Sequence, residues 1–119
     1  MPKIIAAAVV RMGSSRLPGK TLMEVAGKPL LGHLLDRLKQ CETLDGIVVA
    51  TTIKEAGDAI AYFCQNNSMP CFRGSEDDVL ERMVGAYQML GAEIGVEAFG
   101  DGPLIDPAVV DRIVNAYLN

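Results

Sequence analysis

Short apolar runs alternate with amphipathic segments along the whole chain, and this alternation constrains the fold more than any other feature. Apolar runs of strand length occupy residues 3–10, 46–52, 69–72 and 93–98. Each is followed, after a few polar residues, by a segment whose apolar residues recur at helical spacing. Strands and helices that alternate through short connections form a mostly parallel sheet with right-handed crossovers. We therefore predict an α/β fold that is Rossmann-like and doubly wound, with about four strands and helices on both faces.

Helix-start signals support the first two helices. Pro29 is a suitable first residue for a helix whose inner face carries leucines. Thr52 and Glu55 have the spacing of a capping box, which predicts a second helix that continues to about Asn66. The leucines of the first helix are Leu30, Leu31, Leu34, Leu35 and Leu38.

The third and fourth helices also have recognisable starts. Ser75, followed by Asp78, is predicted to cap the third helix, which ends at Gly91. Asp106 as the cap and Pro107 as the first helical residue begin the fourth helix, which is amphipathic. The residues that we expect to face inward from the third helix are Val79, Leu80, Met83, Val84, Tyr87 and Leu90.

Length and composition favour one domain. The 119 residues are 50% hydrophobic, which is enough for a single core, so we expect residues 1–119 to fold as one unit. No run approaches the ~20 apolar residues of a membrane-spanning helix, and the apolar opening is too short for a signal peptide. The sequence therefore favours a cytoplasmic protein without a membrane partner. The three cysteines suit neither a disulfide framework nor a zinc site, which favours free thiols.

Charge is divided unevenly along the chain. Residues 1–40 hold seven Lys or Arg against two acids, whereas residues 41–119 hold four against thirteen. A nucleic-acid surface would spread its cations along one face, so this division argues against a nucleic-acid partner and for a compact anion site near the N-terminus. The acidic remainder is typical of an ordinary solvated surface.

The cations gather in the segment RMGSSRLPGK, residues 11–20, directly after the first strand. A triphosphate needs several cationic donors and backbone that can approach its oxygens closely. Glycines at 13 and 19 allow that approach, and Ser14 offers a hydroxyl. In a P-loop, Gly-Lys-Ser/Thr leads directly into a helix. Here GKTL leads into another short segment, MEVAGKP, so the segment differs from a P-loop. It lies at the carboxyl end of a strand, where α/β folds bind ligands, although a solvated basic loop is the alternative.

These residues also carry a family resemblance. RMGSSRLPGK, followed by L-x-x-(V/I)-x-GKPLL and a leucine-rich helix, resembles the start of the cytidylyltransferase family that includes acylneuraminate and spore-coat polysaccharide (CMP-sugar) synthetases. The likeness continues through VVATT, FRGSEDDVLER and GDGPLIDP, so it covers nearly all of the chain. Because such family members continue well beyond these motifs, the chain is predicted to be the nucleotide-binding half of a longer nucleotidyltransferase domain.

The resemblance implies an activity and a set of roles. The activity is the transfer of CMP from CTP to a sugar hydroxyl with release of pyrophosphate, and the cofactor is Mg²⁺. The sugar is an acidic one, such as a nonulosonic acid, or a sugar of a spore-coat or surface polysaccharide. The resemblance implies that Arg11, Arg16 and Lys20 bind phosphates, and Arg11 and Lys20 are the catalytic candidates. It also implies that the end of the first strand at Val10, together with Gly13 and Ser14, contacts the nucleotide.

The resemblance extends to three residues further along the chain. Asp101 is implied to hold the metal ion. An acid between two glycines at a strand end can hold Mg²⁺, but Gly-Asp-Gly-Pro is also a good turn by itself. Arg73 and Asp78 are implied to lie near the base. For the acids at 76–78 a structural role suffices, because they complement the dipole of the helix that follows.

Some positions depart from the family pattern, and they keep a second hypothesis open. The family tends to have an arginine, a threonine and a cysteine where this chain has Glu97, Phe99 and Gly102, and a glutamine and an alanine where it has Val9 and Val10. A carboxylate near a triphosphate opposes its charge. The alternative to an active enzyme is thus a truncated or degenerate nucleotide-binding module without turnover.

Open sheet edges and the last helix predict that the chain forms a homo-oligomer. The apolar residues of that helix are Val109, Val110, Ile113, Val114, Tyr117 and Leu118.

Overall fold

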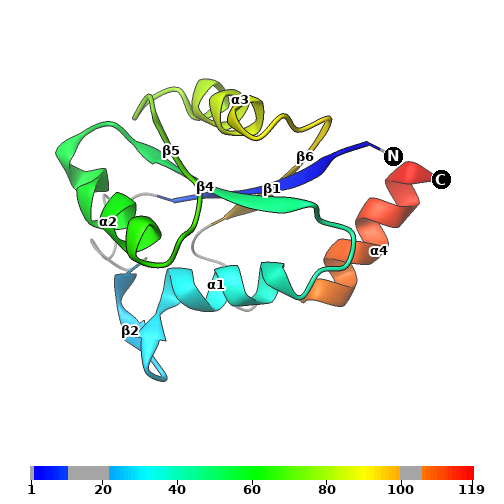
Figure 1. Cartoon of the computed structure of the whole chain (residues 1–119), viewed down its shortest axis with the longest axis horizontal. Coiled ribbons are helices and arrows are strands. Elements are labelled where there is room, and N and C mark those ends of the chain that lie inside the picture. Colours follow the sequence, from blue (N-terminus) through cyan, green and yellow to red (C-terminus); the bar gives the residue numbers. More distant parts are fainter. Residues whose placement is uncertain (1, 11–21, 100–105) are drawn as a thin grey trace.

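Four parallel strands form the central sheet of the computed structural model, which describes residues 2–10, 22–99 and 106–119 (Figure 1). The strands are β1 (Ile4–Val9), β4 (Gly46–Thr52), β5 (Cys71–Gly74) and β6 (Ile94–Phe99). Their order is β5-β4-β1-β6, and every neighbouring pair is parallel. The predicted α/β class and the predicted parallel sheet are therefore confirmed.

Helices cover both faces of this sheet, as predicted. α3 (Val79–Met89) lies on one face, and α1 (Leu30–Lys39) and α2 (Asp58–Asn66) lie on the other, with α4 (Pro107–Leu118) beside the end of α1 (Figure 1). A short 3-10 turn, η2 (Glu55–Gly57), precedes α2. None of the helices in the described part of the chain is long and apolar enough to cross a membrane.

The apolar run of β1 is buried because its side chains pack under helices on both faces of the sheet. Ala6 and Ala8 pack into the cluster under α1 and α2, where the four leucines Leu31, Leu34, Leu35 and Leu38 are buried. Ile5 and Ala7 point the other way, into the cluster under α3. A central strand of a doubly wound sheet has no solvated face, so its sequence is apolar without alternation.

α3 packs on the sheet through only part of the predicted set, because Tyr87 and Leu90 contact the cluster under the helix as predicted. Arg82 and Ala86 are buried, whereas Val79, Leu80 and Val84 are exposed. The reason is the small residue Gly85, where an added Cβ would lie 2.6 Å from Cε2 of the Phe72 ring. The helix therefore approaches the sheet closely at Gly85, and Val79, Leu80 and Val84 are left outside.

Two predicted caps also differ from the structure. Thr52 is the last residue of β4, its Oγ1 accepts a hydrogen bond from the amide of Lys54, and α2 begins without a side-chain cap. The cap of α3 is Asp78, whose Oδ1 accepts from the amide of Glu81 at 2.9 Å. Ser75 instead accepts from the amide of Asp78 at 3.0 Å. The predicted cap of α4 is confirmed, because Asp106 Oδ1 accepts from the amide of Ala108 at 2.9 Å.

A two-stranded hairpin before α1 is absent from the sequence prediction. β2 (Glu24–Val25) pairs with β3 (Lys28–Pro29) in antiparallel fashion through a turn at Ala26 and Gly27, which have φ of 53° and 87°. Such two-residue turns favour Asn-Gly or Asp-Gly. Ala-Gly is a weaker signal, and strands of two residues show no alternation. Pro29 consequently ends β3, and the helix begins one residue later.

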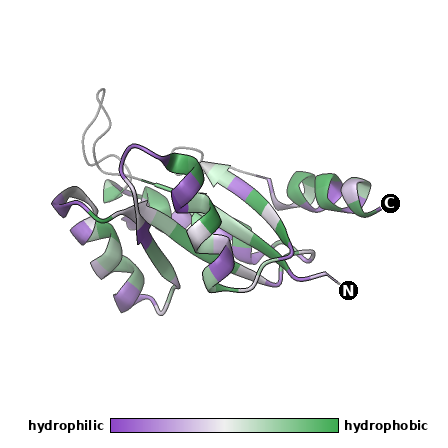
Figure 2. Cartoon of the chain, turned by 90° about the horizontal axis from the view of Figure 1, so that it is seen from above, coloured by the Kyte–Doolittle hydropathy of each residue, from purple (hydrophilic) through white to green (hydrophobic). Residues whose placement is uncertain are grey.

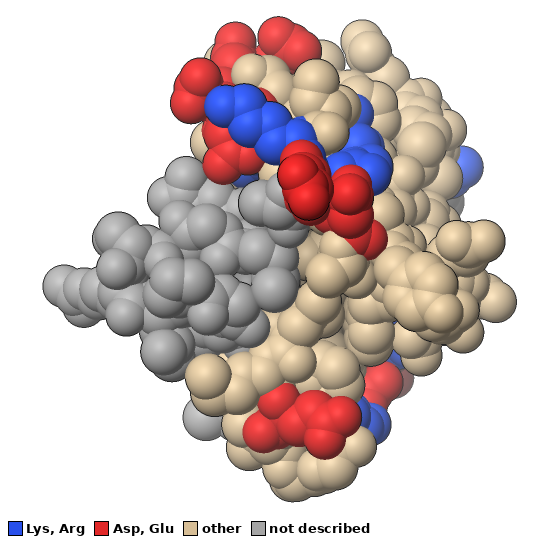
Figure 3. Space-filling model, turned by 90° about the vertical axis from the view of Figure 1, so that its left-hand side faces the viewer, with Lys and Arg blue, Asp and Glu red and all other residues tan. Residues whose placement is uncertain are grey.

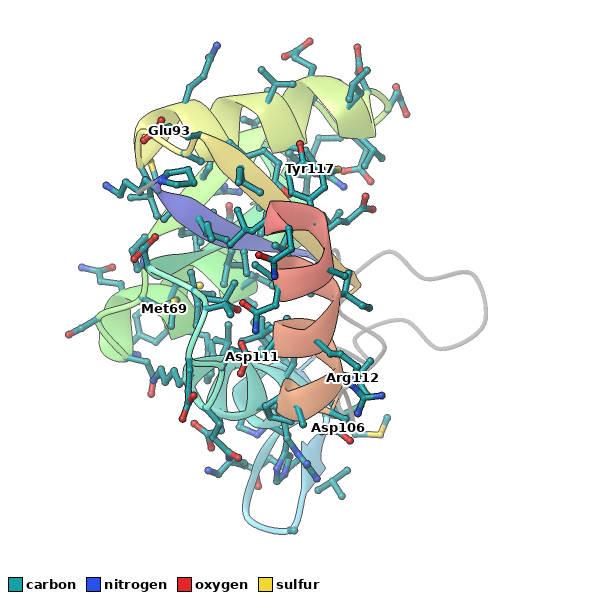
Figure 4. All side chains as sticks on the ribbon, turned by 90° about the vertical axis from the view of Figure 1, so that its right-hand side faces the viewer. Met69, Glu93, Asp106, Asp111, Arg112 and Tyr117 are labelled. Carbon is teal, nitrogen blue, oxygen red and sulfur yellow. The ribbon has the colours of Figure 1, made fainter. Side chains whose placement is uncertain are left out.

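α4 packs through only part of the predicted apolar set. Val110 and Val114 are buried against Ile4 and Cys41. Asp111 fixes the helix by accepting hydrogen bonds from the amides of residues 42 and 43, each at 3.0 Å, and it points toward that connection in Figure 4. An apolar stripe remains outside: Val109, Ile113 and Tyr117 are 42%, 65% and 75% exposed. Figure 2 shows the hydrophobic bands on this helix at one end of the molecule.

Candidate functional site

The strand order locates the place where a ligand is expected. From β1 the sheet extends on one side through β4 to β5. The next strand in sequence, β6, lies on the opposite side of β1. Such a reversal of direction opens a crevice outside the carboxyl ends of the two strands that flank it. Val9 pairs with Phe99 at these ends. The carboxyl ends of the two strands that precede residues 11–21 and 100–105 in the sequence thus lie side by side.

Most of the predicted site residues belong to those two segments. They lie outside the described residues, and their roles remain predictions. The residues concerned are Arg11, Gly13, Ser14, Arg16, Lys20 and Asp101.

Val10 is the last described residue before the basic segment. Its side chain is 3% exposed and packs into the cluster under α1, and its amide donates to the carbonyl of Ala50 at 3.0 Å. The valine side chain is therefore part of the core. A contact between Val10 and a nucleotide would use main-chain atoms.

Arg73 holds the connection between β4 and α2 through hydrogen bonds to its carbonyl groups. Its Nε donates to the carbonyl of Thr52 at 2.9 Å, and its Nη2 donates to the carbonyl of Lys54 at 2.9 Å. The same Nη2 forms an ion pair with Asp58 at 2.7 Å. The guanidinium thus joins the end of β5 to the connection between β4 and α2. This arrangement gives Arg73 a positioning role in the described structure.

Asp78 shapes the connection between β5 and α3. Its carboxylate caps α3, and its amide is held by Ser75. The first turn of a helix carries partial positive charge and free amides, so this capped end is a suitable neighbour for an anion or a polar base edge. The described contacts of Asp78 are therefore structural, and Asp78 lies at the same edge of the sheet as Arg73.

Arg82 is a residue at this edge that the sequence analysis did not single out. It is 2% exposed, and its Nη1 donates to the carbonyl of Ser75 at 3.0 Å. The backbone of Gly74 lies against it, because a Cβ at Gly74 would be 3.2 Å from Arg82 Cα. The signal in the sequence is its position one helical turn after the capping residue Asp78, which places it on the inner side of the loop.

Glu97, which departs from the family pattern, is exposed on the α3 side of β6. Burial, and next the negative charge of Glu97, raise the pKa of Tyr87 to about 12. The carboxylate therefore lies within electrostatic reach of the α3 face. It is two residues before the carboxyl end of β6.

Charges of both signs lie at the carboxyl edge of the sheet. Figure 3 looks onto this edge and shows acidic side chains next to basic ones around the undescribed segments. Among residues 2–10, 22–99 and 106–119, no group of three or more His, Cys, Asp or Glu side chains could hold a metal ion. Two hollows in the described surface lie elsewhere. One is at the amino ends of the strands, beside Lys3 and Gly46, and the other lies between α1 and α4.

Comparison with known proteins gives a consistent family match. The model of the cytidylyltransferase family matches residues 4–119. The chain is 34% identical to the spore coat polysaccharide biosynthesis protein SpsF of Bacillus subtilis, with 92% of this chain and 47% of that protein covered. It spans about half the length of the curated relatives that it matches.

Two solved structures extend the likeness to three dimensions. A cytidylyltransferase from Leptospira borgpetersenii superposes with a TM-score of 0.86 at 34% identity, covering 98% of this chain and 48% of that one. The CMP:2-keto-3-deoxy-manno-octonic acid synthetase complexed with CTP superposes with a TM-score of 0.79 at 28% identity, covering 96% and 46%. The four-stranded sheet and its helices therefore have the arrangement found in nucleotidyltransferases.

Proposed function

Since the chain belongs to the cytidylyltransferase family, we propose that it binds CTP with Mg²⁺ and transfers CMP to a sugar hydroxyl, releasing pyrophosphate. One observation carries the proposal. The pairing of Val9 with Phe99 brings together the carboxyl ends of the two strands that precede the basic segment and Asp101 in the sequence. Cations and a metal-binding acid are the two groups that a nucleoside triphosphate requires.

The cations of residues 11–20 would carry most of the binding. Arg11, Arg16 and Lys20 would neutralise the phosphates, and Gly13 and Ser14 would let the backbone approach them. The sugar hydroxyl would attack the α-phosphorus in line as pyrophosphate leaves. Phosphoryl-type transfers of this kind depend on positioning and charge stabilisation rather than on covalent work by the protein. Arg11 and Lys20 would stabilise the charge that develops on the leaving pyrophosphate.

Asp101 is the residue that would hold Mg²⁺. It follows the last residue of β6 by two positions in the sequence, and a carboxylate oxygen is a ligand that Mg²⁺ prefers. When bound, the ion supplies positive charge to the triphosphate oxygens.

Relatives support the class of sugar. One of them is a spore coat polysaccharide protein, and another is a 3-deoxy-manno-octulosonate cytidylyltransferase of Geobacter sulfurreducens, which is 34% identical. We propose an acidic sugar, such as a nonulosonic or octulosonic acid, or a sugar of a surface polysaccharide. Further proposed features are a cytoplasmic site of action and a homo-oligomeric state.

Glu97 favours a second candidate, a module that binds nucleotide without turnover. Its exposed carboxylate lies near the end of β6, where it would oppose the negative charge of a triphosphate. Pyrophosphate release with CTP, Mg²⁺ and a panel of acidic sugars distinguishes the two candidates. Release that depends on both CTP and one sugar supports the enzyme, whereas CTP binding without release supports the module. Failure to bind CTP contradicts both.

A further inference from the structure

Cys64 and Cys71 are brought together on the face of the sheet that α1 and α2 cover. Cys64 lies in the last turn of α2 and is fully buried, whereas Cys71 begins β5 and is half-buried. Cys71 pairs with Val49 in the parallel register, and all three side chains belong to the same apolar cluster. Each of the two thiols is the largest influence on the pKa of the other.

The connection between the two cysteines keeps them in place. The amide of Met69 donates to the carbonyl of Cys64 at 2.9 Å, and the amide of Asn67 donates to the same carbonyl at 3.2 Å. Ser68 adopts a positive φ of 52°, which turns the chain sharply. The end of α2 and the start of β5 are therefore held against each other by main-chain bonds.

The two thiols differ in their readiness to react. The neighbouring thiol of Cys64, and next the charge of Arg73, lower the pKa of Cys71 against the opposing effect of burial. The neighbouring thiol of Cys71, together with burial, raises the pKa of Cys64. A thiolate is the reactive form of cysteine. Cys71 is thus the thiol that ionises first, and it is also the one that solvent reaches.

We propose that Cys64 and Cys71 form a reversible disulfide when the protein meets a peroxide. The Cys71 thiolate attacks one oxygen of hydrogen peroxide, the O–O bond breaks, and the leaving hydroxide takes a proton to become water. Cys71 is then a sulfenic acid. Cys64 loses its proton and attacks that sulfur, the S–O bond breaks, and a second water leaves. The two thiols lose two electrons, which reduce one peroxide to two waters, and a dithiol reverses the reaction.

The bond would fasten the end of α2 to β5 two residues before Arg73. That arginine holds the connection between β4 and α2 at the candidate site. Oxidation would therefore stiffen the loops on the carboxyl edge of the sheet. The inference rests on the cysteine pair and is independent of the nucleotide and sugar.

Trypsin provides a direct test on the whole chain. Cleavage after Lys54 and Arg73 leaves both cysteines on one peptide, residues 55–73, while Cys41 lies on the peptide of residues 40–54. The folded protein is treated with hydrogen peroxide, unfolded in iodoacetamide and digested. We expect the 55–73 peptide to lose the mass of two hydrogen atoms and to escape alkylation, and dithiothreitol to restore both thiols. The Cys41 peptide should be alkylated throughout.

Single variants establish the order of the steps. In Cys64→Ser, the sulfenic acid of Cys71 has no thiol to resolve it, so we expect dimedone to label Cys71. In Cys71→Ser, we expect Cys64 to stay reduced at the same dose. Alkylation of both thiols in wild-type protein, at a peroxide dose that oxidises glutathione in the same tube, overturns the proposal. A disulfide from either cysteine to Cys41 overturns it as well.

Discussion

Val9 and Phe99 are direct partners at the carboxyl ends of the parallel strands β1 and β6. This pairing occurs where the sheet order reverses, which is where folds of this kind bind ligands. The sequence after β1 contains the cations Arg11, Arg16 and Lys20, and the sequence after β6 contains Asp101. We propose that these two stretches of sequence contribute to one site.

The basic segment should supply most of the binding energy for CTP. We predict that Arg16→Ala or Lys20→Ala weakens CTP binding by about 1.5–3 kcal/mol, the usual value of a hydrogen bond to a charged group. Isothermal titration calorimetry measures the loss. Lys39→Ala is the matched control, because that exposed lysine lies beside the hollow at the opposite, amino edge of the sheet and should leave affinity unchanged. Unchanged affinity in both Arg16 and Lys20 variants would place the triphosphate elsewhere.

Two helical glycines should respond to alanine in opposite directions. Gly85→Ala forces a methyl group against the ring of Phe72, and overpacking of this kind costs about 1–3 kcal/mol. At Gly32 the nearest atoms to an added Cβ are 3.5 and 3.6 Å away, which is ordinary contact. Gly32→Ala should therefore gain about 0.5–1 kcal/mol from helix propensity. Urea unfolding of both variants measures these changes, and equal effects would refute the close approach of α3 to Phe72.

Arg82 should be required for stability although it is charged. Replacement by Met keeps most of the side-chain volume but leaves the carbonyl of Ser75 without its donor. We predict a loss of about 1–3 kcal/mol in the free energy of unfolding, the cost of an unsatisfied buried polar group. Arg112→Met on the exposed side of α4 is the control and should change stability by less than about 0.5 kcal/mol. Equal stability of the two variants would contradict the buried role.

The exposed stripe on α4 should promote self-association. Val109, Ile113 and Tyr117 form one face of the helix, and Ile113 is its central residue. We predict that sedimentation velocity shows a concentration-dependent shift to larger species and that Ile113→Asp removes it, because the charge would be desolvated in an interface. Asn115→Asp adds the same charge off the stripe and should not. A wild-type monomer at high micromolar concentration would count against the homo-oligomer.

The fold could be predicted from sequence because its strands are apolar runs bounded by clear helix signals. The strand at residues 46–52 and the cap at Asp106 agree with the structure at the level of single residues. Periodicity alone failed for part of α3, where Val79, Leu80 and Val84 are exposed while Arg82 and Ala86 are buried. The hairpin at residues 24–29 was missed because each of its strands has only two residues.

The site was less accessible to sequence reasoning than the fold. The cations of residues 11–20, which follow β1 in the sequence, predict a phosphate-bearing ligand, and this stays a prediction. The structural contacts of Arg73 and Arg82 could not be predicted, because they connect β5 and α3 to carbonyl groups set by the tertiary fold. A main-chain acceptor has no signature in the sequence, so a buried arginine appears there only as another charge.

Selective binding of cytidine triphosphate is the central claim, and calorimetry on the folded chain tests it most directly. CTP, UTP, GTP and ATP are titrated in turn, each with and without Mg²⁺. We predict measurable heat for CTP with Mg²⁺, weaker heat when Mg²⁺ is omitted, and little or none for the other three nucleotides. Equal heats for all four nucleotides, or none for CTP, from a chain whose circular dichroism shows it to be folded, would contradict the assignment.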